Sequence, residues 1–180
     1  LYLFTNHKTN LFKINFMENQ KATVKKFVLN YGLMLGIISV IFGVIMYVTN
    51  VYLNPGILYT IIGFLIYIII ISLAIKAFKT ENGGFLSLSE ALKVGIGVSV
   101  IGGIIAALWS FVLMNYIEPD YMNQMIEVQR EKMIEMQPDM TEAQLDDAAE
   151  MASKFSSPLI SIAISLIGSL FFGLVISLIA

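Results

Sequence analysis

The stretch FLSLSEALKVGIGVSVIGGIIAALW, from Phe85 to Trp109, decides the fold of this chain. It opens with a helix start signal, because Ser87 and Glu90 stand at the spacing of a capping box. In that motif the two side chains each bond a backbone amide at the start of the helix. After Lys93 no charged residue follows until Glu118. Since a spanning helix needs about 20 apolar residues, the stretch predicts the entry and body of one membrane span.

The composition of the chain indicates an integral membrane protein. Of its 180 residues, 57% are hydrophobic and 13% are charged, whereas an average soluble domain has about 25% charged residues. The mean hydropathy is +0.79, so the chain has too little polar surface to cover a soluble core. There is no cysteine, which removes disulfides, thiolate metal sites and cysteine nucleophiles.

The spans follow from the charge-free runs. The run from Phe27 to Ile75 covers 49 positions without a charge, which is room for two spans. Asn54-Pro55-Gly56 breaks it, because proline lacks an amide donor and glycine admits positive φ. We expect an all-α, four-helix membrane bundle in a single domain, 17–180, with spans at about 28–48, 57–75, 88–115 and 158–180. Much of the second span, rich in isoleucine and leucine, is expected to face lipid.

Residues 1–16 are excluded from this fold. They show no clean period, and Met17 follows at once as a plausible start. We interpret 1–16 as a non-native or disordered prefix. A short amphipathic arm on the membrane surface is the alternative.

Small residues repeat along the spans, and such residues let helix backbones approach closely in lipid. Gly32 and Gly36 form one such pair on the first span. Spans three and four each repeat small residues every four positions, which predicts that they pack against each other. The residues of these two ladders are Gly95, Ser99, Gly103 and Ala107 on span three, and Ser161, Ser165, Ser169 and Gly173 on span four. The serines could also line a polar path, but packing is the favoured interpretation.

The polar segment 116–157 separates the last two spans. It holds ten acidic and three basic residues, a formal charge of −7. Apolar residues recur there at helical spacing on both sides of Pro138, which predicts two amphipathic helices. Its acidic rows could bind divalent cations or a basic partner, and its methionines copper or a partner, but solvated and packed helix faces are favoured. Asp139–Glu150 fails as an EF-hand because Gln144 stands where glycine is needed. We predict no metal site.

The distribution of basic residues predicts the orientation. Six lysines, Lys21 to Lys93, fall on one side of a four-span model, and three basic residues of the polar segment fall on the other. The positive-inside rule therefore places both termini in the cytoplasm and segment 116–157 outside, as an extracytoplasmic helical hairpin. We expect Lys93 and Trp109 to act as interfacial anchors at opposite ends of the third span.

The start of the third span also carries a resemblance. In NGGFLSLSEALKVG, from Asn82 to Gly95, the pattern formed by Ser89, Glu90, Ala91, Lys93 and Gly95 resembles that of an uncharacterised bacterial membrane family, domain of unknown function 4199. The resemblance covers roughly 25–180. It implies four spans with a polar segment between the last two, a bacterial inner-membrane location and no known activity.

No constellation of catalytic residues is visible. His7 is the one histidine, and no ionisable residue lies in the interior of a span. We therefore expect a non-enzymatic protein without cofactors and without nucleic-acid binding. Its partners would be the lipid bilayer and either a like subunit or another membrane protein, bound through the small-residue faces or the polar segment. A small transporter or channel subunit is the alternative.

The predicted orientation can be tested with a single cysteine, because the chain has none of its own. We expect Asp146→Cys to react with a membrane-impermeant thiol reagent in intact spheroplasts. Labelling only after the membrane is permeabilised would invert the topology.

Overall fold

The computed structural model describes residues 23–155 and 157–180, and every regular element in these ranges is helical. The prefix 1–16 and Lys21 lie outside the described residues. The elements are α2 (Val24–Val48), α3 (Ile57–Glu81), α4 (Leu88–Val112), the π-helix η1 (Leu113–Ile117), α5 (Tyr121–Met136), α6 (Glu142–Phe155) and α7 (Pro158–Ile179).

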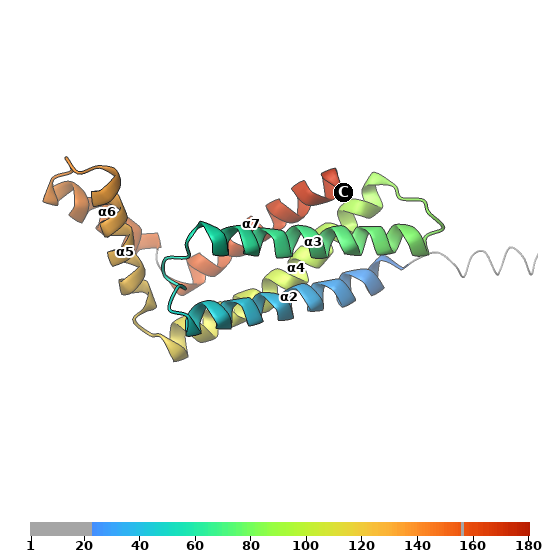
Figure 1. The fold of residues 1–180 in the computed structure, drawn as a ribbon, viewed down its shortest axis with the longest axis horizontal. Coiled ribbons are helices and arrows are strands. Elements are labelled where there is room, and N and C mark those ends of the chain that lie inside the picture. The colour runs from blue at the N-terminus through green and yellow to red at the C-terminus, as the bar shows by residue number, and fades with distance from the viewer. Residues whose placement is uncertain (1–22, 156) are drawn as a thin grey trace, which may run out of the picture.

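Four helices in the described ranges are long and apolar enough to cross a membrane: α2, α3, α4 with η1, and α7. The predicted all-α fold with four spans is confirmed. These helices run along one another, and α5 and α6 lie beyond one end of the bundle (Figure 1). We call this the hairpin end. The opposite end, which we call the basic end, carries the C terminus (Figure 1) and the lysines Lys25, Lys26, Lys76, Lys79 and Lys93.

Helix α4 is the centre of the bundle. It contacts each of the other three spans, most extensively α2 and next α7. Its start is fixed by the predicted capping box, which is confirmed. The Glu90 amide donates to the Ser87 hydroxyl, and the Glu90 carboxylate accepts from the Ser87 amide. Capping of this kind satisfies amides that would otherwise lack a partner in the first turn.

Helices α2 and α4 run parallel, and glycines on each receive large side chains of the other. A Cβ atom built on Gly32 would lie only 2.7 Å from the Cβ of Ile101, so even alanine would force the two helices apart. The glycine pairs of this interface are Gly32–Ile101, Gly36–Ile105 and Gly43–Trp109, with the glycine on α2, and Gly97–Val28 and Gly102–Leu35, with the glycine on α4.

Helices α4 and α7 run antiparallel and meet through small residues on both sides. Successive contacts lie four residues later on α4 and four residues earlier on α7. They are Gly95–Ser177, Ser99–Gly173 and Gly103–Ser169. The Ser169 hydroxyl also donates to the Ser99 carbonyl oxygen across the interface, at 3.5 Å. Interhelical hydrogen bonds and close backbone contact are the forces that join helices in lipid.

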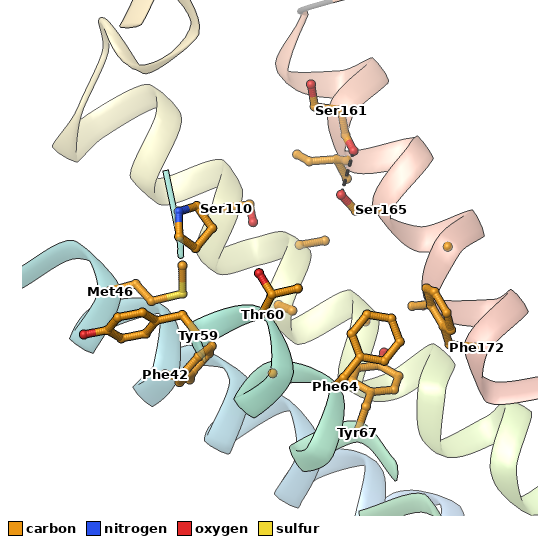
Figure 2. Close-up of a pocket in the computed structure, with 18 of the residues that line it drawn as sticks. Phe42, Met46, Tyr59, Thr60, Phe64, Tyr67, Ser110, Ser161, Ser165 and Phe172 are labelled. Carbon is orange, nitrogen blue, oxygen red and sulfur yellow. Dashed lines mark hydrogen bonds between the residues drawn. The ribbon is translucent and has the colours of Figure 1, made fainter. Parts of the chain in front are cut away.

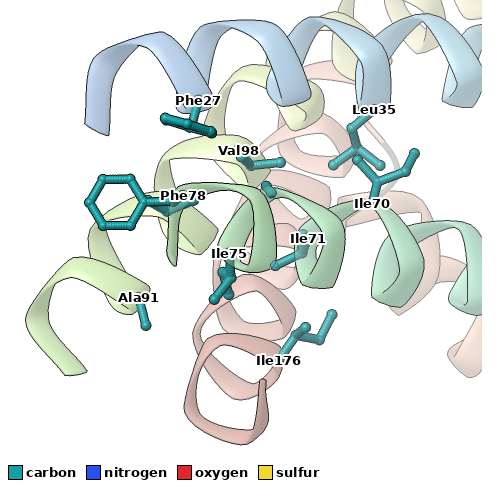
Figure 3. Packing of buried hydrophobic residues seen from close by; sticks show 11 residues of the cluster. Phe27, Leu35, Ile70, Ile71, Ile75, Phe78, Ala91, Val98 and Ile176 are labelled. Atoms are coloured by element: carbon teal, nitrogen blue, oxygen red, sulfur yellow. The ribbon is translucent and has the colours of Figure 1, made fainter. Parts of the chain in front are cut away.

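The buried apolar side chains gather toward the basic end (Figure 3). Leu35, Ile71 and Val98 are fully buried there, and the rings of Phe27 and Phe78 meet edge to face, with 5.5 Å between centroids. Helix α3 is exposed along most of its first half and buries one face from Ile70 to Phe78.

Helix α3 also continues six residues past Ile75, where the second span was expected to end. The extension buries Phe78 in the core. It also brings Glu81 within 3.0 Å of the Lys26 ammonium. That ion pair is exposed and contributes little to stability, so the burial of Phe78 is the stronger reason for the extension.

The polar segment forms two helices, α5 and α6, so the prediction of two helices there is confirmed. Pro138 lies in the turn between them. Leu145 is buried between them at 4% exposure. Arg130 of α5 joins them through Glu142 at 2.7 Å and Asp146 at 3.3 Å. The expected Glu150–Lys154 pair is also present, at 2.8 Å.

The close contact of α4 with α7 predicts a position-specific cost for adding one methyl group to α7. Gly173→Ala would place a Cβ against the Ser99 hydroxyl, and we expect it to destabilise the protein by about 1–3 kcal/mol. Gly168→Ala is the matched control, because nothing lies within 4 Å of a Cβ at that position. The control should leave stability unchanged or raise it by up to about 1 kcal/mol. Thermal unfolding in detergent measures both, and equal melting temperatures would contradict the packing.

Candidate functional site

A cavity of about 480 Å³ lies between all four spans, and most of its wall belongs to the hairpin-end half of the bundle. Its volume is within the range of small-molecule pockets, about 300–1,000 Å³. Figure 2 shows Ser161 and Ser165 of α7 across the cavity from Tyr59 and Thr60 of α3. The remaining residues of the wall include Phe42 and Met46 of α2, Phe64 and Tyr67 of α3, Ala106, Ala107 and Ser110 of α4, and Gly168, Ser169 and Phe172 of α7.

The cavity exists because small residues continue along α4 and α7 while the helices separate. Gly103 and Ser169 are in contact. One turn nearer the hairpin end, Ala107 and Ser165 keep the same spacing, but the two helices diverge there and the cavity lies between them (Figure 2). A side chain on Gly168 would find open space. Neither helix offers enough side-chain bulk to fill the gap, so the space between them stays open.

The wall is apolar and carries several hydroxyl groups. Tyr67 of α3 and Ser169 of α7 both line the cavity with their hydroxyl-bearing side chains. The Ser165 hydroxyl donates to the Ser161 carbonyl oxygen at 2.9 Å, and the Thr60 hydroxyl to the Gly56 carbonyl oxygen at 3.4 Å. No charged side chain is among the described residues that line it. Such a wall suits a neutral, mostly apolar molecule.

The rings of Phe64 and Phe172 lie on the cavity wall and meet edge to face between α3 and α7, with 4.8 Å between centroids. Among the pairs of spans that pack against each other, α3 and α7 have the least contact. The cavity is partly open to its surroundings. Both helices are long and apolar enough to cross a membrane.

The π-helix η1 shapes the outer side of the cavity. It adds a residue per turn at Leu113–Ile117, where the Glu118 amide donates to the Leu113 carbonyl oxygen at 2.7 Å. This turn buries Leu113 and places Met114 on the cavity wall. Short π-helical turns in proteins are found frequently at functional sites.

A tyrosine cluster lies beside the cavity at the base of the hairpin. The Tyr52 ring stacks on Tyr121 with 5.9 Å between centroids, and the Tyr52 hydroxyl donates to the Gln124 side-chain oxygen at 3.1 Å. Gln124 in turn donates to the Glu118 carboxylate at 2.7 Å. Desolvation and the nearby Glu118 charge raise the pKa of Tyr52, and desolvation also raises the pKa of Tyr121. Both phenols therefore stay protonated and able to donate around neutral pH.

The sequence-predicted residues fall into three groups. Gly32 and Gly36 of α2 lie against side chains of α4. The contact between α4 and α7 contains Gly95, Ser99, Gly103, Ser169 and Gly173. Ala107, Ser161 and Ser165 line the cavity, as do Gly103 and Ser169 at its deep side. Of the expected anchors, Lys93 is exposed at the basic end and Trp109 packs against Gly43 near the hairpin end.

The cavity is not among the features predicted from the sequence. The available signal was a set of hydroxyl side chains within the spans, Thr60, Tyr67 and Ser110, in addition to the serines of span four. Their positions along three different helices show no common period, so only the folded arrangement reveals that they surround one space.

The fold and the cavity define a multi-pass, all-α membrane protein with an uncharged pocket inside the bundle. The model of the family described as "Protein of unknown function (DUF4199)" matches residues 30–180, and the chain belongs to that family. No curated protein and no solved structure matches the chain.

Proposed function

We propose that this protein is non-enzymatic and acts by association within the membrane, with the cavity between the four spans as its binding site. The single observation that supports this is an uncharged, partly open cavity of about 480 Å³ at membrane depth. Its hydroxyl and apolar groups offer contacts for binding, but no group that would act as an acid or base near neutral pH. The partner would be a hydrophobic molecule or segment that reaches the cavity from the bilayer.

The small residues that suggested association between chains mostly serve packing within one chain. Gly32, Gly36, Gly95 and Gly103 are each covered by a neighbouring helix, so a like subunit or partner protein cannot use them without opening the bundle. Ser165 and Gly168, on the cavity wall, are not covered in this way. For this reason the proposal locates association at the cavity.

The proposed setting is a bacterial inner membrane, with both termini in the cytoplasm and the α5–α6 hairpin outside. The lysines of the basic end support this orientation through the positive-inside rule. The rings of Tyr47 and Tyr121 each contact that of Tyr52 near the hairpin end, and such a tyrosine cluster suits the opposite membrane interface.

A small transporter or channel subunit is the second candidate. It is supported by the position of the cavity, because most of its wall lies toward the hairpin end, whereas the apolar core around Ile71 and Val98 fills the bundle toward the basic end. A transporter needs a second state in which that core opens. Solute flux in reconstituted vesicles would support this candidate, and tight vesicles across a broad solute panel would count against it.

A photoreactive side chain tests the binding site directly. We expect benzoylphenylalanine at Ser165, on the cavity wall, to give one discrete adduct on irradiation of native membranes. The matched control is the same group at Ile164, which is 58% exposed and outside the cavity, and which should give the broad mixture expected of bulk lipid. The same mixture at both positions would contradict a specific site.

A further inference from the structure

The shape of the cavity limits what can occupy it, provided that the cavity is the binding site proposed above. Its wall runs along α7 from Ser161 to Ile176 and along α4 and η1 from Gly103 to Met114. At a rise of about 1.5 Å per residue, these stretches give a length of roughly 16–22 Å. A volume of about 480 Å³ over this length leaves a mean cross-section of roughly 20–30 Å².

This mean cross-section suits a single extended chain better than a transmembrane helix. A helix with its side chains is about 10–12 Å wide, a cross-section of roughly 80–110 Å². A helix from a partner or a second copy would have to push α3 and α7 apart and break the Phe64–Phe172 contact. A single extended alkyl or prenyl chain, in contrast, is narrow enough for the space as it stands.

The polar groups of the wall indicate the chemistry of the head group that such a chain would carry. Ser110 and Ser161 are half-buried on the outer part of the wall. Within the described residues, neither hydroxyl donates a hydrogen bond to a protein group. Both can therefore donate to an oxygen of a bound molecule. Since no lysine or arginine lines the described wall, a buried phosphate would remain uncompensated, and burying an unpaired charge is costly.

We propose that the cavity binds one uncharged, single-chain lipid with an oxygen-bearing head, such as a long-chain alcohol or a monoacylglycerol. Its chain extends past Phe64 and Phe172 toward Ile176, and its head oxygen accepts hydrogen bonds from Ser110 and Ser161. It enters from the bilayer on the flank between α3 and α7, where these helices have little contact.

The test uses the full chain in phosphatidylcholine vesicles and two photoreactive probes. The first is a long-chain alcohol with a diazirine on its chain, and the second is a phosphatidylglycerol with the same diazirine-bearing chain. We expect the alcohol, read out by mass spectrometry of peptides, to label the walls contributed by α3 and α7. Unlabelled alcohol should compete, and the phosphatidylglycerol should label these walls at least about tenfold less, because its charge is not compensated there.

Two variants connect the labelling to the cavity. Gly168→Leu adds bulk where the structure has open space and should lower labelling by the alcohol at least about tenfold. Ser165→Phe repeats the measurement if that variant does not fold. Ile167→Phe is the control, because Ile167 is 67% exposed and lies outside the cavity wall, and it should label as the parent does.

Equal labelling by both probes, or labelling that Gly168→Leu does not change, would overturn the lipid assignment. If benzoylphenylalanine at Ser165 instead cross-links to a peptide of a second copy or of another protein, the lipid assignment is wrong, but association at the cavity is supported. If benzoylphenylalanine gives the same mixture of adducts at Ser165 and at Ile164, the cavity is not a specific binding site.

Discussion

The structure depends on the close approach of α4 to helices on two of its sides. Lipid supplies no hydrophobic force between spans, so they must be held by contact and hydrogen bonds. Glycines of α2 and α4 admit large side chains such as Ile101 and Leu35, whereas α7 meets α4 through small residues on both helices. The first arrangement interlocks the parallel pair, and the second brings two backbones together near Ser99 and Gly173.

The same small residues also explain where the close packing of α4 against α7 gives way to a cavity. Toward the basic end they lie beside the buried cluster of Leu35, Ile71 and Val98, which fills the space between the spans. Toward the hairpin end no such cluster is present among the described residues, and α4 and α7 diverge there, with Ala107 and Ser165 on the wall of the cavity between them (Figure 2). Because residues this small cannot fill the resulting gap, one end of the bundle is solid while the other holds a cavity.

Much of the fold could be predicted because it depends on local signals. The capping box at Ser87, the break at Pro55 and the helices on each side of Pro138 each act over a few residues. The cavity could not be predicted in this way. Gly103 and Ala107 belong to one uninterrupted ladder, and four-residue spacing shows which residues share a face but not where the opposite helix departs from it. The length of α3 also depended on a distant contact, the burial of Phe78 in the core.

Disulfide trapping in the cysteine-free chain tests the separation of α4 and α7 most directly. A Cβ on Gly103 lies 3.4 Å from the Cβ of Ser169, close to the spacing of a disulfide, so Gly103→Cys with Ser169→Cys should cross-link under mild oxidation. Ala107→Cys with Ser165→Cys, one turn further along the same ladders, should remain reduced because the cavity lies between them. Equal cross-linking of both pairs would mean that the helices stay together and that the cavity does not exist.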